Sequence, residues 1–246
     1  MAGHSKWANI RFRKGLQDAK RGKIFTKLIR EISVAARMGG ADETSNARLR
    51  DAVTKALKAN MKRDTIDNAV KRGVGGLDGA HMVEMRYEGY GPGGVAILVD
   101  CLSDNKNRTV SEVRHAFTKQ GGNLGTDGSV AYLFNKQGSI LLAPQTDLDK
   151  IMDLVIETGA VDVLLEEGQL EVVTTAETYH TMLAVLQAEG IEVDHAEVIM
   201  NAQTTVSMDK DTALSLEKLV DALEDLDDVQ VVHTNAEYVD HAALES

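Results

Sequence analysis

The spacing of the apolar residues changes once along this 246-residue chain, at the glycine-rich segment 73–79. Before that segment, apolar residues recur every three or four positions and predict amphipathic helices over about 20–38, 46–59 and 64–72. After it, short alternating or continuous apolar runs are typical of β-strands. One uniform fold class is therefore excluded, and we expect a helical N-terminal domain followed by α/β domains.

Residues that favour helix ends set the expected limits of the three helices. Gly39 and Gly40 are expected to stop the first helix, and Leu57 belongs to the apolar face of the second. Asp64 is expected to cap the third helix at its N-terminus, and Gly73 is expected to end it. The segment 73–79 is then a linker.

The region after the linker begins with two strands joined by a tight turn. The turn is Gly89–Gly94, and it displays Tyr90. A helix follows, and Thr109 and Glu112 have the spacing of a capping box near its start. The predicted strands are Val83–Tyr90, Val95–Leu102 and Val130–Phe134, and the predicted helix is Asn107–Gln120.

Residues 138–199 repeat one arrangement twice, strand–helix–strand. The resulting order, βαββαβ, is that of the ferredoxin-like plait, in which helices cover one face of an antiparallel sheet. The predicted strands are 139–142, 161–165, 170–174 and 192–199, and the predicted helices are 148–158 and 176–188.

The remaining residues supply a strand near 204–207, a helix over about 211–226 and a strand over 229–233. Set beside 95–134, they complete a second set of α/β elements. The predicted fold is therefore α+β and multidomain: an N-terminal helical domain, then two ferredoxin-like α/β domains, the third inserted into the second. The predicted domains are 1–79, 80–136 together with 201–240, and 137–200. Simple tandem domains are the alternative.

Charge is distributed very unevenly along the chain. Residues 1–75 contain 18 basic and 7 acidic side chains, whereas residues 137–246 contain 3 basic and 24 acidic ones, within a net charge of −11. Such a division favours a polyanionic partner for the basic part. Two alternatives remain: a solvated, charged helical surface, or a basic region that docks on the chain's own acidic half.

The basic N-terminal stretch is the strongest candidate for a nucleic-acid-binding site. Lysine and arginine neutralise phosphates, and Trp7 and Phe12 could stack on exposed bases. The alternative is a basic terminus whose Trp7 packs on the helices. Helices 46–59 and 64–72 could form a helix-turn-helix, although an ordinary three-helix bundle with a basic rim is favoured, because only Asn68 is suited to reading bases. The proposed nucleic-acid-binding residues are Lys6, Trp7, Arg11, Arg13, Lys14, Lys20, Arg21, Lys23, Lys27, Lys62, Arg63, Lys71 and Arg72.

Two further segments are weaker candidates. Ser103–Thr109 joins a strand to a helix N-terminus and could hold a phosphate, although a capped loop is at least as good an interpretation. The acidic run Glu217–Asp228 is most simply a solvated helix face, and it could also mimic nucleic acid or dock a basic protein surface. Possible secondary contacts with nucleic acid are Tyr90, Asn105, Lys106 and Arg108.

Other classes of function have little support in the sequence. The chain has one cysteine, Cys101, which lies in an apolar run and is expected to be a buried thiol in a reducing cytoplasm. No apolar run is long enough to span a membrane, and no secretory signal is expected. The pair Glu112 and His115 is a weak hint of metal or acid–base chemistry. We therefore expect no catalytic residues, no metal and no cofactor.

Several long motifs resemble those of the YebC family. They are Met1–Ile10, Lys20–Glu31, Tyr87–Gly94, Ser103–Thr109, Glu112–Phe117 and Gly121–Tyr132. The resemblance implies a helical N-terminal domain and two α/β domains, with the third inserted in the second. It also implies a DNA-binding transcriptional regulator or, as in related proteins, a ribosome-associated translation factor or translational activator. The partner is then DNA or ribosomal RNA. A flexible basic arm suits RNA, whereas the family label favours DNA, and the oligomeric state stays open.

Overall fold

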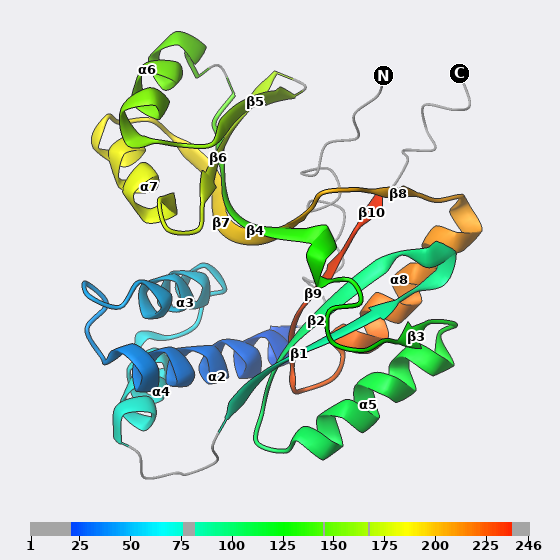
Figure 1. Ribbon diagram of the computed structural model, residues 1–246. Coiled ribbons are helices and arrows are strands. Elements are labelled where there is room, and N and C mark those ends of the chain that lie inside the picture. Colours follow the sequence, from blue (N-terminus) through cyan, green and yellow to red (C-terminus); the bar gives the residue numbers. More distant parts are fainter. Residues whose placement is uncertain (1–20, 76–81, 145, 167, 238–246) are drawn as a thin grey trace. The chain divides into compact units, whose positions relative to one another are not determined.

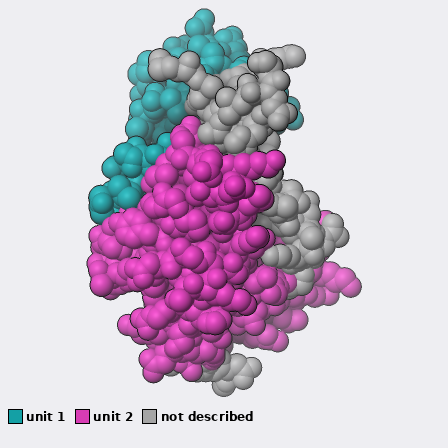
Figure 2. All heavy atoms as spheres, turned by 90° about the vertical axis from the view of Figure 1, so that its right-hand side faces the viewer, with its two compact units in different colours: residues 1–9, 132–205 teal, residues 10–131, 206–246 magenta. Residues whose placement is uncertain are grey.

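The computed structural model describes residues 21–75, 82–144, 146–166 and 168–237. The described residues form two compact units, coloured separately in Figure 2. One unit spans 132–205 and is here called the plait unit. The other combines 21–131 with 206–237 and is called the main unit. Along the chain, the plait unit therefore lies between two segments of the main unit.

The main unit begins with three helices, α2 (Arg21–Gly39), α3 (Ala47–Lys58) and α4 (Arg63–Gly75). Their shared core is aliphatic and includes Ile32, Leu49 and Ile66, each fully buried. Asn46 joins α2 to α3: its side-chain oxygen accepts from the Leu49 amide at 3.0 Å, and its side-chain nitrogen donates to the Ala35 carbonyl at 2.8 Å. The three predicted helices are confirmed.

Three details of these helices were predicted wrongly. Asp64 lies inside the first turn of α4, which starts at Arg63, so it is not the N-cap. Gly73 lies within α4 and is buried against α2. A Cβ on Gly73 would collide with the Ser33 carbonyl oxygen and lie 2.8 Å from the Ala36 Cβ. This glycine therefore permits a close approach of two helices instead of ending one. Leu57 is 46% exposed and does not belong to the core.

A four-stranded antiparallel sheet follows in the main unit, in the order β3-β1-β2-β9. Its strands are β1 (Val83–Tyr90), β2 (Ala96–Ser103), β3 (Asn123–Leu124) and β9 (Val229–Thr234). Helices α5 (Lys106–Lys119) and α8 (Lys210–Glu224) pack on one face of it, where Ile97, Phe117 and Leu216 are fully buried (Figure 1). Two short strands, β8 (Val206–Ser207) and β10 (Ala236–Glu237), pair in parallel.

The strand predicted at Val130–Phe134 is absent: a 3₁₀ turn, η3, covers Ala131–Leu133. The buried Glu88 carboxylate explains this, because it accepts from the amides of Gly128, Val130 and Ala131 at 2.7–2.8 Å. Burial raises the pKa of Glu88, but these amides outweigh burial and the pKa is lowered overall. Backbone amides held by a carboxylate cannot join a sheet ladder.

The capping box predicted at Thr109 and Glu112 is also wrong. The N-cap of α5 is Asn105, whose side chain accepts from the Arg108 amide at 3.0 Å. Thr109 lies one turn into the helix and is 1% exposed, with its hydroxyl directed to the Asn105 carbonyl and to Asp228.

The plait unit has the predicted βαββαβ order, with strand order β5-β6-β4-β7 and all neighbours antiparallel. Its two helices cover one face of the sheet (Figure 1), where Ile140, Ile151 and Leu186 are fully buried. The elements are β4 (Phe134–Leu142), α6 (Leu148–Thr158), β5 (Asp162–Glu166), β6 (Gln169–Thr175), α7 (Tyr179–Ala188) and β7 (Val193–Ala202).

The predicted fold class is confirmed: the chain is α+β, with a helical N-terminal region followed by two antiparallel sheets that carry helices. Across the described segments, no helix combines the length and the apolar character that crossing a membrane requires.

Candidate nucleic-acid interface

The predicted site residues fall into three groups. Those at the start of the chain lie outside the described residues: Lys6, Trp7, Arg11, Arg13, Lys14 and Lys20. Arg21 opens α2, but its side chain is also outside the description. The cations of α2 and those of α3 and α4 form the other two groups, and their surroundings differ.

Lys23 and Lys27 of α2 bind the C-terminal end of α8. Lys23 Nζ donates to the Asp225 carbonyl at 2.9 Å and lies 3.4 Å from its carboxylate. Lys27 Nζ donates to the Glu224 carbonyl at 2.8 Å. The last carbonyls of a helix carry partial negative charge and lack intrahelical partners, so cations stabilise them. Lys23 and Lys27 therefore follow the alternative expectation, in which basic residues dock on the chain's own acidic half.

Arg30 and Arg108 meet at the buried carboxylate of Asp228, which directly precedes β9. Arg30 Nη1 donates to Oδ1 at 3.0 Å, and Arg108 Nη2 donates to Oδ2 at 2.8 Å. The hydroxyls of Ser103 and Thr109 each donate to Oδ2 at 2.8 Å. Burial raises the pKa of Asp228, but these donors outweigh burial and lower it overall.

Asp228 occupies the place where the sequence suggested a phosphate site, Ser103–Thr109. The hydroxyls and the guanidinium that could have held a phosphate bind the chain's own carboxylate. The pKa of Arg108 is raised, first by Asp228 and then by Asp104. The segment is therefore a capped loop, and Arg108 serves as part of an internal ion pair.

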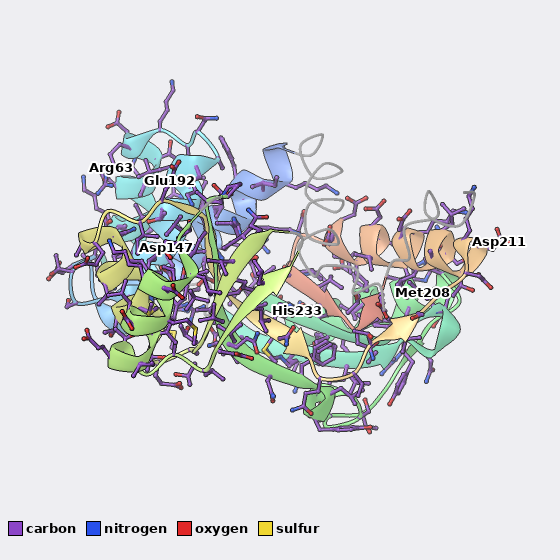
Figure 3. All side chains as sticks on the ribbon, turned by 90° about the horizontal axis from the view of Figure 1, so that it is seen from above. Arg63, Asp147, Glu192, Met208, Asp211 and His233 are labelled. Atoms are coloured by element: carbon purple, nitrogen blue, oxygen red, sulfur yellow. The ribbon has the colours of Figure 1, made fainter. Side chains whose placement is uncertain are left out.

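The cations of α3, of α4 and of the turn between them differ in their pairing. Arg48 and Arg50 are half-buried, and Arg48 pairs with Glu31 and Glu84. Arg63 is exposed, and its guanidinium contacts Glu43 at 2.7 Å and Asp67 at 3.1 Å; Figure 3 labels it on the helical region. The remaining cations are exposed, and no described acidic group lies within ion-pair distance of them. These unpaired cations are Lys55, Lys58, Lys62, Lys71 and Arg72, and together they are called the α3–α4 basic surface.

On α4, the exposed residues share one face. Asn68, Lys71 and Arg72 are exposed, whereas Ile66 and Ala69 are buried against the other helices. At 100° per residue, positions 68, 71 and 72 lie on the same side of a helix, facing solvent. A polyanion that contacts this face meets two cations and one amide.

The connection between α3 and α4 is a tight turn with Asn60 at φ +63° and Met61 buried. This geometry is compatible with both interpretations of the sequence, a helix-turn-helix and a three-helix bundle with a basic rim. The core is shared by all three helices. Asn68 is the one exposed amide side chain on α4.

The predicted secondary contacts do not gather at the α3–α4 basic surface. Tyr90 is 37% exposed, and its hydroxyl donates to the Ser129 carbonyl at 2.9 Å. Asn105 is used as the cap of α5, and Lys106 is exposed at the start of that helix.

Sequence reasoning missed Lys55 and Lys58. Their positions on α3, away from buried Ala52 and Ala56, would have identified them, had the helical periodicity been applied to the charged residues as well. The ion pair of Arg30 with Asp228 joins positions 198 residues apart, and no local sequence pattern predicts it.

The described residues hold no metal cluster, and their one thiol is buried. Among them, no group of three or more His, Cys, Asp or Glu side chains could hold a metal ion. Cys101 is buried, and burial raises the pKa of its thiol to about 12, so it is a poor nucleophile.

The fold and the charge define an α+β protein with a basic helical region and two acidic regions that each contain a sheet. Comparison with known protein families identifies the family of this chain. Residues 5–76 match the TACO1/YebC protein N-terminal domain, and residues 82–236 match the TACO1/YebC second and third domain. The chain belongs to the TACO1/YebC family.

Relatives resemble the chain over nearly its whole length. A "probable transcriptional regulatory protein" of Legionella pneumophila is 71% identical over 238 residues, covering 97% of this chain and 96% of that protein. A protein of the same description from Idiomarina loihiensis is 57% identical, covering 98% and 97%. A crystal structure of a conserved hypothetical protein from Aquifex aeolicus matches with a TM-score of 0.77 and 45% identity, covering 91% of this chain and 93% of that one.

Proposed function

We propose that this protein is a non-enzymatic, cytoplasmic regulator of gene expression that binds nucleic acid through the α3–α4 basic surface. The names of its relatives support the regulatory class. The observation that carries the proposal is the division of the cations into two sets. Lys23 and Lys27 of α2 bind the end of α8, whereas a second set faces solvent: Lys55, Lys58, Lys62, Lys71 and Arg72.

This division matters because an internally paired cation has little left to offer a phosphate. A phosphate that competed for Arg30 would have to displace a carboxylate that is 3% exposed. The exposed lysines have no such competitor, and each phosphate they neutralise releases a counterion. The basic residues before position 21 extend the same positive region along the sequence.

The exposed side chains favour contacts with the backbone of a nucleic acid over the reading of bases. Lysine is a compact point charge, and phosphate contacts position a protein without specifying sequence. Asn68 is the main exposed group on α4 that is suited to an adenine edge. This composition favours structured RNA. Action on translation through ribosomal RNA is therefore a second candidate function, beside transcriptional regulation through DNA.

The test is crosslinking in cells followed by sequencing of the attached nucleic acid. The variant Lys62→Gln, Lys71→Gln, Arg72→Gln removes three exposed charges from the α3–α4 basic surface. Its matched control, Lys136→Gln, Lys210→Gln, Lys218→Gln, removes three exposed charges elsewhere.

We expect the first variant to lose most of its crosslinked nucleic acid and the control to keep it. Ribosomal RNA in the crosslinked material supports the translational version, and defined duplex DNA sites support the transcriptional one. Equal crosslinking by both variants and the parent overturns the proposed surface.

A further inference from the structure

Helix α6 of the plait unit carries two parallel stripes on its surface. Leu148, Met152 and Ile156 follow one another at four-residue intervals and are 40%, 42% and 74% exposed. One position further on, Asp149, Asp153 and Glu157 repeat the same interval and are also exposed. Residues four apart are neighbours on a helix, so an apolar stripe lies directly beside an acidic one.

The apolar stripe lies on the flank of α6 that is turned away from α7. Ile151 and Val155 of α6 are buried in the core, and the Thr158 hydroxyl lies 2.7 Å from the Met182 sulfur on α7. At 100° per residue, the stripe is on the opposite side of the core-facing line from Thr158. Exposed apolar side chains in a row mark an interaction site more often than isolated ones do.

Strand β5 contacts the same helix and forms one edge of the sheet. It pairs with β6 on one side, and no described strand pairs with its other side. Leu165 of β5 stands opposite Leu170, a core residue, and therefore points to the helix-covered side of the sheet, yet it is 61% exposed. Val161, just before β5, is 63% exposed.

These features combine an open strand edge with an apolar surface next to it. The open edge offers backbone N–H and C=O groups that a further strand can pair with, which proteins otherwise tend to protect. Leu148, Met152, Ile156, Val161 and Leu165, together with the outer edge of β5, are here called the α6–β5 edge.

The charge around the α6–β5 edge selects the partner. Residues 132–205 contain two basic side chains, Lys136 and Lys150, against thirteen acidic ones. Lys150 is occupied, with its ammonium 3.5 Å from the Glu189 carboxylate. An acidic partner would be repelled from this unit, whereas a basic one gains complementary charge, including that of exposed Asp162 on the face of the sheet opposite α6.

We propose that the α6–β5 edge binds an extended, basic segment of a partner protein, in which Lys or Arg alternates with apolar residues, as a fifth strand beside β5. Side chains of a strand alternate between the two faces of a sheet. The apolar side chains of the segment then cover the flank of α6. Its basic side chains lie on the opposite face of the sheet, where Asp162 also lies. Because β5 is five residues long, the paired part of the segment is of similar length.

A synthetic nine-residue peptide of alternating lysine and valine serves as the probe, with binding to the full-length protein followed by fluorescence anisotropy. A second peptide carries N-methyl groups on alternate amides, which removes the donors that would pair with β5 and leaves the side chains unchanged. We expect the parent peptide to bind at least about tenfold more tightly than the methylated one.

The protein variant Met152→Ser, Ile156→Ser is expected to weaken binding of the probe by about tenfold or more. Both side chains are exposed, so folding should not suffer. The matched control is Leu214→Ser, which changes an exposed apolar residue (48%) on α8 of the main unit and should leave binding unchanged. The affinity of both variants for nucleic acid should equal that of the parent, so this proposal can fail independently of the proposed function.

Three results would overturn the proposal. Equal binding of the methylated peptide excludes strand addition, and equal binding by the Met152→Ser, Ile156→Ser variant excludes the site. Displacement of the probe by a peptide of residues 1–20, at lower concentration than unlabelled probe, assigns the edge to the chain's own N-terminal segment and not to another protein.

Discussion

Removing the carboxylate of Asp228 should break the buried ion pairs that Arg30 of α2 and Arg108 of α5 make with it. Asp228 receives hydrogen bonds from Arg30, Arg108, Ser103 and Thr109, while only 3% of its side chain is exposed. Losing one member of a buried ion pair costs roughly 3–5 kcal/mol, because the remaining charge is left without its partner.

The expected cost for Asp228→Ala lies at the lower end of that range. The side chain of Arg108 is 42% exposed and keeps Asp104, so it regains water at little cost. Arg30 is 20% exposed and keeps the Asp227 carbonyl at 2.5 Å. The Ser103 hydroxyl, which is buried, loses its acceptor. We therefore expect a loss of about 3 kcal/mol in the free energy of unfolding.

Urea unfolding followed by circular dichroism measures this loss. With a slope of roughly 1–3 kcal/mol per molar urea, the midpoint should fall by about 1–3 M. The neighbouring substitution Asp227→Ala is the control, because it removes an exposed carboxylate and keeps the backbone carbonyl that Arg30 uses. Equal midpoints for Asp228→Ala and Asp227→Ala would refute the idea that this buried carboxylate holds α2 in place.

Three further predictions concern single positions of the main unit. Gly73→Ala should lower the free energy of unfolding by about 2 kcal/mol or more, because its Cβ would collide with Ser33, whereas Gly75→Ala meets nothing within 4 Å and should be neutral or slightly stabilising in urea titrations. Burial raises the pKa of Asp100, but hydrogen bonds from His233 and Arg86 lower it overall to about 2, so its stabilisation is present above pH 4 and is lost as the pH falls toward 2. The parent should thus lose about 2 kcal/mol more than Asp100→Asn over that interval in acid unfolding, and parallel curves would contradict this. Cys101 should resist iodoacetamide at pH 8 in the folded protein and react after unfolding, as mass spectrometry can follow; rapid labelling of the native chain would contradict its burial.

Periodicity was a sufficient guide to most of the fold. Every α-helix that the structure describes was expected from its apolar spacing, and the βαββαβ order of the plait unit followed from the alternation of strand and helix patterns. The errors arose where a residue acts through space. Gly73 has the local signature of a helix end but serves the contact between α2 and α4, and Glu88 captures amides some forty positions later.

The candidate site was predictable only in part for the same reason. The exposure of Lys71 and Arg72 follows from their positions opposite the apolar face of α4. Lys23 and Lys27 looked equally suitable in the sequence, yet they bind the end of α8, about 200 residues away. Composition identified the positive region, but only the tertiary contacts distinguish the cations that hold the protein together from those available to a ligand.

The most direct test of the account is the salt dependence of nucleic-acid affinity. On a plot of log affinity against log salt, each phosphate contact with duplex DNA contributes a slope of about −0.9. The variant Lys62→Gln, Lys71→Gln, Arg72→Gln should therefore flatten the parent's slope by about 2–3, while Lys136→Gln, Lys210→Gln, Lys218→Gln should leave it unchanged. If the slope is the same for the parent and both variants, the α3–α4 basic surface does not meet phosphate, and the account is contradicted.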